Sequence, residues 1–431
     1  MSAYKVAIVR LSSLGDVVVS ASLLANARAL YPQIHIDWIV DSSFSAVLES
    51  SPSIDGLIAI ALKKGGMRAI LPIVRQLRAL GQYDMVIDMQ GLIKSAIVAR
   101  MLKARAYWGF RRDSVKEPLA SIFYTHKIEI AYGEHILKRN AKLLLSALAW
   151  LVESGGDSAR GFAVESGAEN RGDSGVDSSV DSVGESRARG DSKTHAQGGN
   201  AGGVRAGVGE RGLREALESS ALWELCSRRA EVFGASEGAH RRAEEILAPL
   251  RSRTQGALES APEHKVKAAQ GALEGKIIVL ILEASLESKA YPVGLCVELV
   301  RLLVGANVLL LGHTSSKARE IKAHFTNEAR VCELPALSLD EVKALLLRAD
   351  LVIGGDTGIT HLAWALGRDS ITLYGNTPPA RFALQGERGG NRALCGSENP
   401  SFDKNDFSIS NITPRAICEC AQAILRGREL C

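Results

Sequence analysis

Short apolar runs alternate with helix-like segments over the first 150 residues of the chain. The runs are rich in Val, Ile and Leu, and each is followed by a stretch with helical periodicity. This alternation predicts a parallel sheet with helices on both faces, because parallel strands need a crossover connection. The expected strands span residues 5–11, 35–40, 57–62 and 84–89, and the expected helices residues 17–30, 69–80 and 92–102.

The same alternation returns beyond residue 275. Thr413 followed by Pro414 has the residue types of a helix N-cap and first helical position, which predicts a C-terminal helix. The fold class is therefore α/β, with two Rossmann-like units facing an interdomain cleft where ligands commonly bind. Strands are expected at 276–283, 307–312, 351–353 and 370–374, and helices at 293–303, 315–324, 339–349 and 360–366.

A low-complexity stretch separates the two units. Residues 153–211 consist largely of Gly, Ser, Asp, Arg, Glu and Ala. Such a composition cannot bury enough apolar surface to offset chain entropy, so we expect a disordered insertion. Helical character returns after residue 213. The predicted boundaries are 1–150 for the first unit, 151–265 for insertion and linker, 266–412 for the second unit and 413–431 for the last helix.

Charge and composition narrow the class of protein. The 431 residues carry a net charge of only +4, which argues against a nucleic-acid-binding protein. No apolar run is long enough to span a bilayer, and Arg10 and Asp16 interrupt the apolar N-terminal region, so we expect neither a transmembrane segment nor a signal peptide.

The seven cysteines are scattered and are expected to be reduced. No metal-ligand spacing occurs, and no metal or cofactor is predicted.

The most informative polar cluster lies at the junction between the expected strand at 351–353 and the helix that follows it. Ligands bind at this position in open α/β sheets, and the free N–H groups of the helix favour an anion such as a diphosphate. Asp356 can accept hydrogen bonds from sugar hydroxyls. His361 either belongs to this binding site or only caps or packs within the helix. The residues of the cluster are Asp356, Thr357, Gly358 and His361.

Two further strand ends carry candidate chemistry. Asp16 follows the first strand, where it is either a routine helix cap or a catalytic carboxylate. Ser12 and Ser13 form the turn before it, which is not a GxGxxG fingerprint, so a dinucleotide site is disfavoured. Lys289 and Ser285 follow the first strand of the second unit and are either solvated or placed to reach a diphosphate.

A small basic cluster lies beyond the third expected strand. Such a cluster is either a solvated charged face or a site for an acceptor that carries phosphates or carboxylates. Its members are Lys63, Lys64 and Arg68.

Five motifs, in order, resemble those of the ADP-heptose:lipopolysaccharide heptosyltransferases, which are GT-B glycosyltransferases. They cover residues 12–16 (SSLGD), 88–95 (DMQGLIKS), 117–124 (EPLASIFY), 356–361 (DTGITH) and 373–377 (LYGNT). The second and third motifs resemble those members that add the first heptose to Kdo-lipid A. The resemblance extends over residues 3–150 and 275–425.

The resemblance implies an inverting, metal-independent transfer of heptose from ADP-heptose to Kdo. Asp16 matches the general base, Ser285 and Lys289 match diphosphate-binding residues, and Asp356 matches the residue that holds the heptose hydroxyls, with His361 beside it. Thr357 and Gly358 would add backbone N–H donors, and the cluster of Lys63, Lys64 and Arg68 would face the acceptor, as would Ser12 and Ser13.

One position departs from the family pattern. Residues 314–317 lack the acidic residue that contacts the nucleotide ribose, and Glu320 comes a turn later. Two alternatives stay open: transfer of the second heptose, or a non-catalytic module that binds a nucleotide-sugar. We expect a cytoplasmic protein, peripheral to the cytoplasmic face of the inner membrane, with ADP-heptose and Kdo-lipid A as partners and no nucleic acid.

Overall fold

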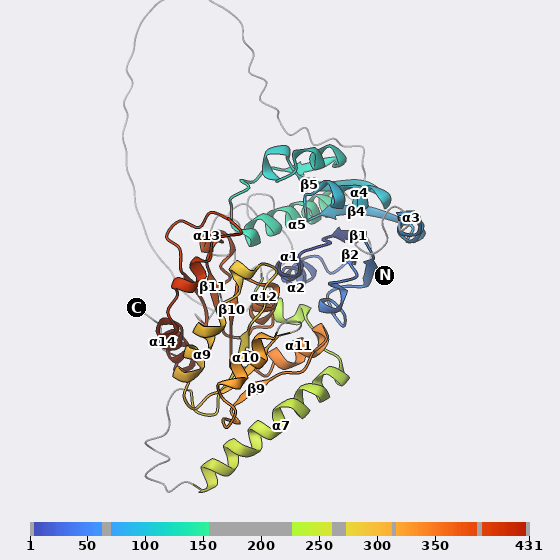
Figure 1. Ribbon diagram of the computed structural model, residues 1–431. Helices are drawn as coiled ribbons and strands as arrows, with labels where there is room; N and C mark the ends of the chain where they lie inside the picture. The colour runs from blue at the N-terminus through green and yellow to red at the C-terminus, as the bar shows by residue number, and fades with distance from the viewer. Residues whose placement is uncertain are drawn as a thin grey trace, which may run out of the picture.

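Two α/β halves make up the computed structural model of the chain (Figure 1). The structure describes residues 4–62, 70–154, 226–260, 273–312, 316–385 and 390–427. Each half is built on a parallel sheet that has six strands within these ranges. The predicted fold class is confirmed. Apart from its first two residues, the predicted disordered segment 153–211 lies outside the described residues.

The first sheet has the strand order β3-β2-β1-β4-β5-β6. β1 and β4 are neighbours at its centre, and the crossover direction changes between them. Such a switch point opens a crevice at the carboxyl ends of the strands, where ligands bind. The strands are β1 (Tyr4–Val9), β2 (Ile34–Asp41), β3 (Gly56–Ile60), β4 (Gln82–Asp88), β5 (Lys103–Phe110) and β6 (His126–Ile128).

The second sheet repeats this topology, with the order β12-β11-β10-β7-β8-β9. Its switch point lies between β7 and β10, which are its first and fourth strands in sequence. The motif around Asp356 follows β10 directly. The strands are β7 (Ile277–Ile281), β8 (Asn307–Leu311), β9 (Val331–Glu333), β10 (Leu351–Gly355), β11 (Ser370–Tyr374) and β12 (Asn391–Cys395).

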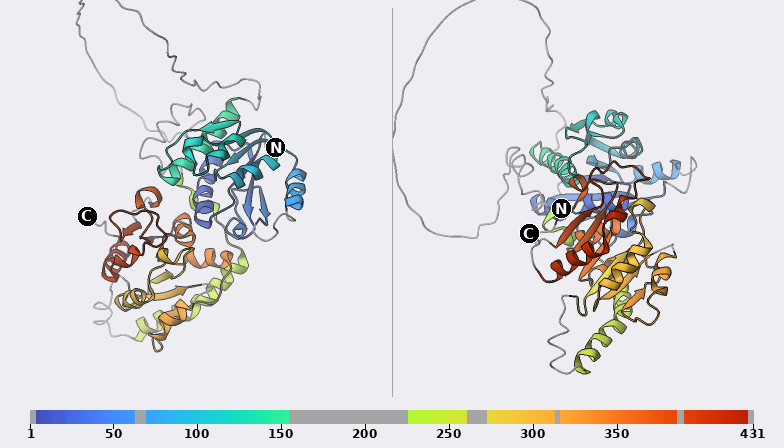
Figure 2. Two further views of the ribbon diagram at one scale, coloured as in Figure 1. Left: turned by 45° about the horizontal axis from the view of Figure 1, so that its top comes forward. Right: turned by 60° about the vertical axis from the view of Figure 1, so that its left-hand side comes forward.

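Helices cover both faces of each sheet (Figure 2). In the first half they are α1 (Leu14–Ala21), α2 (Leu24–Leu30), α3 (Ile70–Ala79), α4 (Ile93–Met101) and α5 (Ile136–Glu153), with short 3-10 turns η1 (Ser45–Val47), η3 (Arg112–Ser114) and η4 (Pro118–Phe123). The rest of the chain adds η7 (Arg229–Val232), α7 (Glu237–Ser260), η8 (Glu287–Lys289), α9 (Val293–Leu302), α10 (Lys317–Ala323), α11 (Leu339–Leu346), α12 (Gly358–Ala365), α13 (Pro379–Phe382), η9 (Ser408–Asn411) and α14 (Pro414–Leu425).

The prediction of one helix over residues 17–30 is wrong. The hydroxyl of Ser22 donates to the carbonyl of Val19 at 2.8 Å, and helix α1 ends just before it. Local side-chain bonds of this kind compete with helix continuation. The C-terminal prediction is confirmed, since the hydroxyl of Thr413 accepts from the N–H of Ala416 at 3.2 Å and caps α14.

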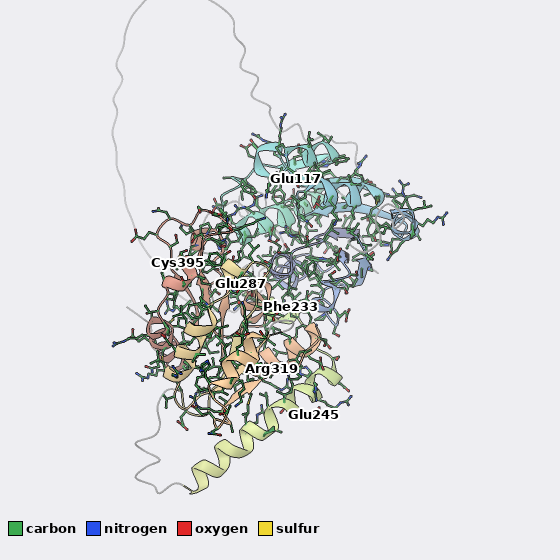
Figure 3. All side chains as sticks on the ribbon, in the orientation of Figure 1. Glu117, Phe233, Glu245, Glu287, Arg319 and Cys395 are labelled. Atoms are coloured by element: carbon green, nitrogen blue, oxygen red, sulfur yellow. The ribbon has the colours of Figure 1, made fainter. Side chains whose placement is uncertain are left out.

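One apolar core runs through both halves. It contains Val18 of α1, Val279 of β7 and Trp364 of α12, together with Val232 and Phe233. Figure 3 labels Phe233 at the junction of the halves. The segment that follows residue 225 thus packs against both halves. α7 then runs along the outer face of the second half and packs on α11.

The halves approach closely where helices α1 and α12 meet at their N-termini. A Cβ atom added to Gly15 would lie 2.8 Å from Cδ2 of His361, and one added to Gly358 would lie 2.6 Å from Cγ of Leu14. Both distances are shorter than side-chain atoms tolerate. Glycine at these two positions therefore lets the two helix ends come together.

We predict that Gly358→Ala lowers the free energy of unfolding by about 1–3 kcal/mol, because the new methyl group overpacks the contact with Leu14. Urea unfolding followed by tryptophan fluorescence measures the change. Gly294→Ala in α9 is the matched control, since a Cβ atom there meets no neighbour within 4 Å. The control should be neutral or stabilising by up to about 1 kcal/mol. Equal behaviour of the two variants would contradict the tight contact.

Candidate functional site

A cavity of about 440 Å³ lies between the two halves. Its walls come from the carboxyl ends of β1, β7 and β10 and from the first turns of α1 and α12. This is the crevice that the two switch points predict. We call it the donor-side cavity. The predicted site residues among its lining residues are Ser13, Asp16, Ser285, Lys289, Asp356, Thr357, Gly358 and His361.

A second cavity, of about 420 Å³, adjoins the first on the side of the first half. Three of the predicted site residues line it: Ser12, Ser13 and Asp16. Ser13 and Asp16 line both cavities, so the carboxylate of Asp16 is placed on their common wall. We call this second space the acceptor-side cavity. Lys63, Lys64 and Arg68 lie outside the described residues.

Asp16 is held by charge and by its own helix cap. Nη2 of Arg10 lies 2.9 Å from Oδ1 of Asp16, and the hydroxyl of Ser13 donates to Oδ2 at 3.0 Å. Arg10 is buried, with 6% of its surface exposed, and also donates to the carbonyl of Met89. The Asp16 side chain remains about one-third exposed. Asp16 is thus fixed in orientation while still open to a bound molecule.

A chain of hydrogen bonds fixes the loop that carries Asp16. The side-chain oxygen of Gln90, at the end of β4, accepts from the N–H of Leu11 at 2.8 Å and of Ser12 at 3.3 Å. Fully buried Asp88 in turn accepts from the N–H of Gln90 at 2.9 Å and from the hydroxyl of Tyr124 at 2.6 Å. Burial raises the pKa of Asp88, although these donors act in the opposite direction.

The carboxylate of Asp356 contacts the side chains of two other predicted site residues. Nζ of Lys289 donates to its Oδ2 at 2.6 Å, and Nε2 of His361 lies 3.0 Å from its Oδ1. The carboxylate is buried, which by itself raises its pKa. The hydrogen bond and charge of His361 and the charge of Lys289 outweigh burial and hold the pKa of Asp356 well below its usual range.

The first turn of α12 adds further anion-binding character. Thr357 is its N-cap and Gly358 its first residue, and the first N–H groups of a helix have no partner within the helix. The helix dipole places partial positive charge at this end. The first turn of α1 faces the same cavity from the other half. Together with Lys289, these features suit a phosphate-bearing ligand.

Comparison with known proteins identifies the family. Residues 70–170 and 230–408 match the model of glycosyltransferase family 9, the heptosyltransferases. The chain belongs to this family. Lipopolysaccharide heptosyltransferase 1 of Campylobacter coli is 28% identical over 97% of the chain and 98% of its own length.

Solved structures support the fold of this glycosyltransferase. The Escherichia coli heptosyltransferase WaaC with ADP matches with a TM-score of 0.59 at 22% identity, over 96% of this chain and 98% of that one. The Escherichia coli ADP-heptose heptosyltransferase II matches with the same score of 0.59 at 16% identity, over 98% of each chain. These matches establish the GT-B arrangement of two Rossmann-like halves.

A third, largely apolar cavity of about 340 Å³ lies at the carboxyl ends of β7 and β8 in the glycosyltransferase. Leu311, Leu337 and Val342 contribute to its walls. Glu283 and Ile359 line both this cavity and the donor-side cavity, so the two spaces adjoin. An apolar space beside an anion site suits a molecule that has a flat base at one end and phosphates at the other.

Several cations of the acceptor-side cavity were missed by the sequence reasoning. Arg10, Lys116, Arg139 and Arg381 all line it, although they come from four distant segments. The only signal in the sequence was their charge, which is common on solvated faces. By contrast Arg111, after β5, does not line this cavity and forms exposed ion pairs with Asp113 and Glu129.

Within the described ranges, no group of three or more His, Cys, Asp or Glu side chains is placed to hold a metal ion. In the same part of the chain, no helix has both the length and the apolar character needed to cross a bilayer.

We predict that Asp356→Asn lowers the free energy of unfolding at pH 7 by about 1–3 kcal/mol, because Lys289 and His361 lose a charged partner. Asp356 has a lowered pKa in the folded state, so its charge stabilises the fold above the unfolded pKa near 3.8. This contribution is lost as the pH falls further.

Urea unfolding at pH 7, 5 and 3.5 measures the difference between the wild type and this variant. The gap should be smaller at pH 3.5 than at pH 5, because the carboxylate of the unfolded chain becomes protonated in this range. Glu419→Gln, which removes an exposed partner of Arg415, is the control and should have little effect at any of these pH values. A gap that widens from pH 5 to pH 3.5 would contradict the lowered pKa of Asp356.

Proposed function

We propose that this protein transfers L-glycero-D-manno-heptose from ADP-heptose to Kdo of Kdo-lipid A, with inversion at the anomeric carbon. The observation that carries the proposal is the position of Asp16 on the wall shared by two adjoining cavities. One cavity has the charge pattern of a nucleotide-sugar site, and the other is lined by cations that suit an anionic acceptor.

The donor would lie across the second half. Lys289, Ser285 and the N–H groups of Thr357 and Gly358 would bind its diphosphate, and the apolar cavity beside β8 would take the adenine. Asp356 has lone pairs beyond those used by Lys289 and His361 and would accept hydrogen bonds from heptose hydroxyls. Lys289 is 22% exposed, so it can turn from Asp356 towards an incoming diphosphate.

The acceptor would approach Asp16 from the other cavity. The carboxylate of Asp16 takes a proton from a Kdo hydroxyl while that oxygen attacks the anomeric carbon of heptose. The bond from the anomeric carbon to the ADP oxygen breaks, and ADP leaves with the bonding electrons. The charge of Lys289 stabilises the phosphate as negative charge develops on it. Arg10 keeps the carboxylate aimed at the shared wall.

A membrane-bound acceptor fits the surface near the acceptor-side cavity. Leu119 and Ile122 of η4 are 62% and 70% exposed, and Lys116, which lines that cavity, lies just before η4 in the chain. Exposed apolar side chains beside a basic residue suit a membrane interface with anionic head groups. We therefore place the protein at the cytoplasmic face of the inner membrane, in peripheral contact with it.

The deciding experiment is mass-spectrometric detection of heptose transfer to two defined acceptors, with ADP-heptose as donor. We expect transfer to Kdo-lipid A that carries no heptose. Transfer only to an acceptor that already carries one heptose would reject our assignment and support the second heptosyltransferase activity. Transfer to neither acceptor, with ADP-heptose still bound, would support a non-catalytic nucleotide-sugar-binding module.

Asp16→Asn tests the general base. Turnover should fall by a factor on the order of 10² or more, because the amide cannot accept the proton. Affinity for ADP-heptose, measured by calorimetry, should stay within severalfold. Asp113→Asn is the matched control, since Asp113 also pairs with an arginine but lines neither the donor-side nor the acceptor-side cavity. Nearly unchanged turnover of Asp16→Asn would show that another group takes the proton.

A further inference from the structure

The second half reaches into the acceptor-side cavity through α13. Arg381 and Phe382 of this short helix line the cavity, although the other lining residues belong to the first half. α13 lies beside the N-terminus of α5 in two views (Figures 1 and 2), and Nε2 of His135 lies 3.0 Å from the carbonyl oxygen of Ala383. The contact fixes α13 against the cavity.

Arg381 has no anionic partner among the described residues. Its guanidinium forms neither a hydrogen bond nor an ion pair with them, and its Nε atom is buried without a hydrogen-bond partner. The group instead stacks over the ring of Tyr132, with its Cζ atom 4.1 Å from the ring centroid. A guanidinium placed in this way has its planar donor edge available for a carboxylate or phosphate.

Arg139 adds a second positive charge on the same side of the cavity. Its Cζ atom lies 5.4 Å from the centroid of the Tyr132 ring, and its guanidinium donates only to neutral carbonyls, including those of Ser114 and Ala131. Burial and the nearby charge of Arg381 lower the pKa of Arg139 to about 10, so Arg139 remains charged at neutral pH. Neither arginine forms an ion pair within the described residues, and their mutual repulsion raises the electrostatic energy of this wall until an anion binds.

We propose that Arg381 of the second half, supported by Tyr132 and Arg139 of the first, binds an anionic group of the acceptor. The inference rests on the proposed function and deepens it. Kdo is a sugar acid, and lipid A carries phosphates, so the shared chemistry is a carboxylate or phosphate oxygen. The half that binds the donor thereby also recognises the acceptor, and an acceptor in place links the two halves across the site.

The test compares wild type with Arg381→Gln and Arg381→Lys, using deacylated Kdo-lipid A as a soluble acceptor. Calorimetry without donor gives acceptor affinity, and initial rates give the two KM values. Arg381→Gln should weaken acceptor binding by roughly ten- to hundredfold, as expected for loss of a charged hydrogen bond. The KM for ADP-heptose should stay within about twofold, and Arg381→Lys should recover part of the loss.

Two modified acceptors distinguish the source of the anion. If Arg381 binds the Kdo carboxylate, an acceptor with that carboxylate as its methyl ester should bind wild type as weakly as the unmodified acceptor binds Arg381→Gln. The same modification should change the acceptor affinity of Arg381→Gln little. If removing the phosphates of the acceptor instead removes the difference in acceptor affinity between wild type and Arg381→Gln, the bound group is a phosphate. Arg415→Gln is the matched control, because this arginine of α14 is 85% exposed and lies outside the cavity.

Acceptor affinity of Arg381→Gln equal to that of wild type would overturn the inference. The same holds if the variant loses affinity equally for all the acceptors and for ADP-heptose, or if wild type binds no acceptor. Binding by wild type that depends on Arg381, without any transfer of heptose, would refute the proposed function and leave the anion site standing.

Discussion

The close contact between the first turns of α1 and α12 is the constraint on which the site depends. Two glycines, Gly15 and Gly358, leave room for Leu14 and His361 to pack across the junction of the halves. Because each helix follows a central strand of its sheet, this contact also brings the two switch points face to face. A larger residue at either glycine would hold Asp16 farther from the motif around Asp356.

Electrostatics then divides the crevice into two sides. In the second half, buried Asp356 pairs with Lys289 and contacts Nε2 of His361, so Lys289 has an anionic partner before any ligand arrives. At the acceptor-side cavity, Asp16 is paired with Arg10, whereas Arg139 of the first half and Arg381 of the second form no ion pair within the described residues. The acceptor-side cavity is therefore lined mainly by cations, while the donor-side cavity is lined by the carboxylates of Asp16, Glu283 and Asp356 together with Lys289.

The segment after residue 225 stabilises the junction of the halves. Nε of buried Arg229 donates to the carbonyl of Trp364 at 2.9 Å, and the backbone N–H of Arg228 donates to Oδ1 of Asn26 in the first half at 3.1 Å. From the opposite direction, Nζ of fully buried Lys343 donates to the carbonyl of Glu49 at 2.9 Å. A linker region thus forms part of the interface between the two halves.

The sequence by itself determined the α/β class and the strands that end at the site, because buried central strands are long apolar runs with an unmistakable pattern. It left out β5, β6, β9 and β12, and it joined α1 to α2. β6 and β9 are three-residue edge strands too short to show a period. β5 and β12 begin with polar or charged residues, Lys103 and Arg105 in one and Asn391 and Arg392 in the other, so neither is an unbroken apolar run. It also singled out Asp16, Lys289 and Asp356, since motifs at strand ends are local features.

Only the tertiary structure decided which residues meet across the chain. Arg381 of the second half lies over the ring of Tyr132 in the first half, and Gln90, just after β4, supports the loop that carries Asp16. No local pattern encodes such pairs, because they arise from the packing of two sheets against one another. The sequence shows that each arginine is charged, but the fold decides which anionic group, if any, lies close enough to pair with it.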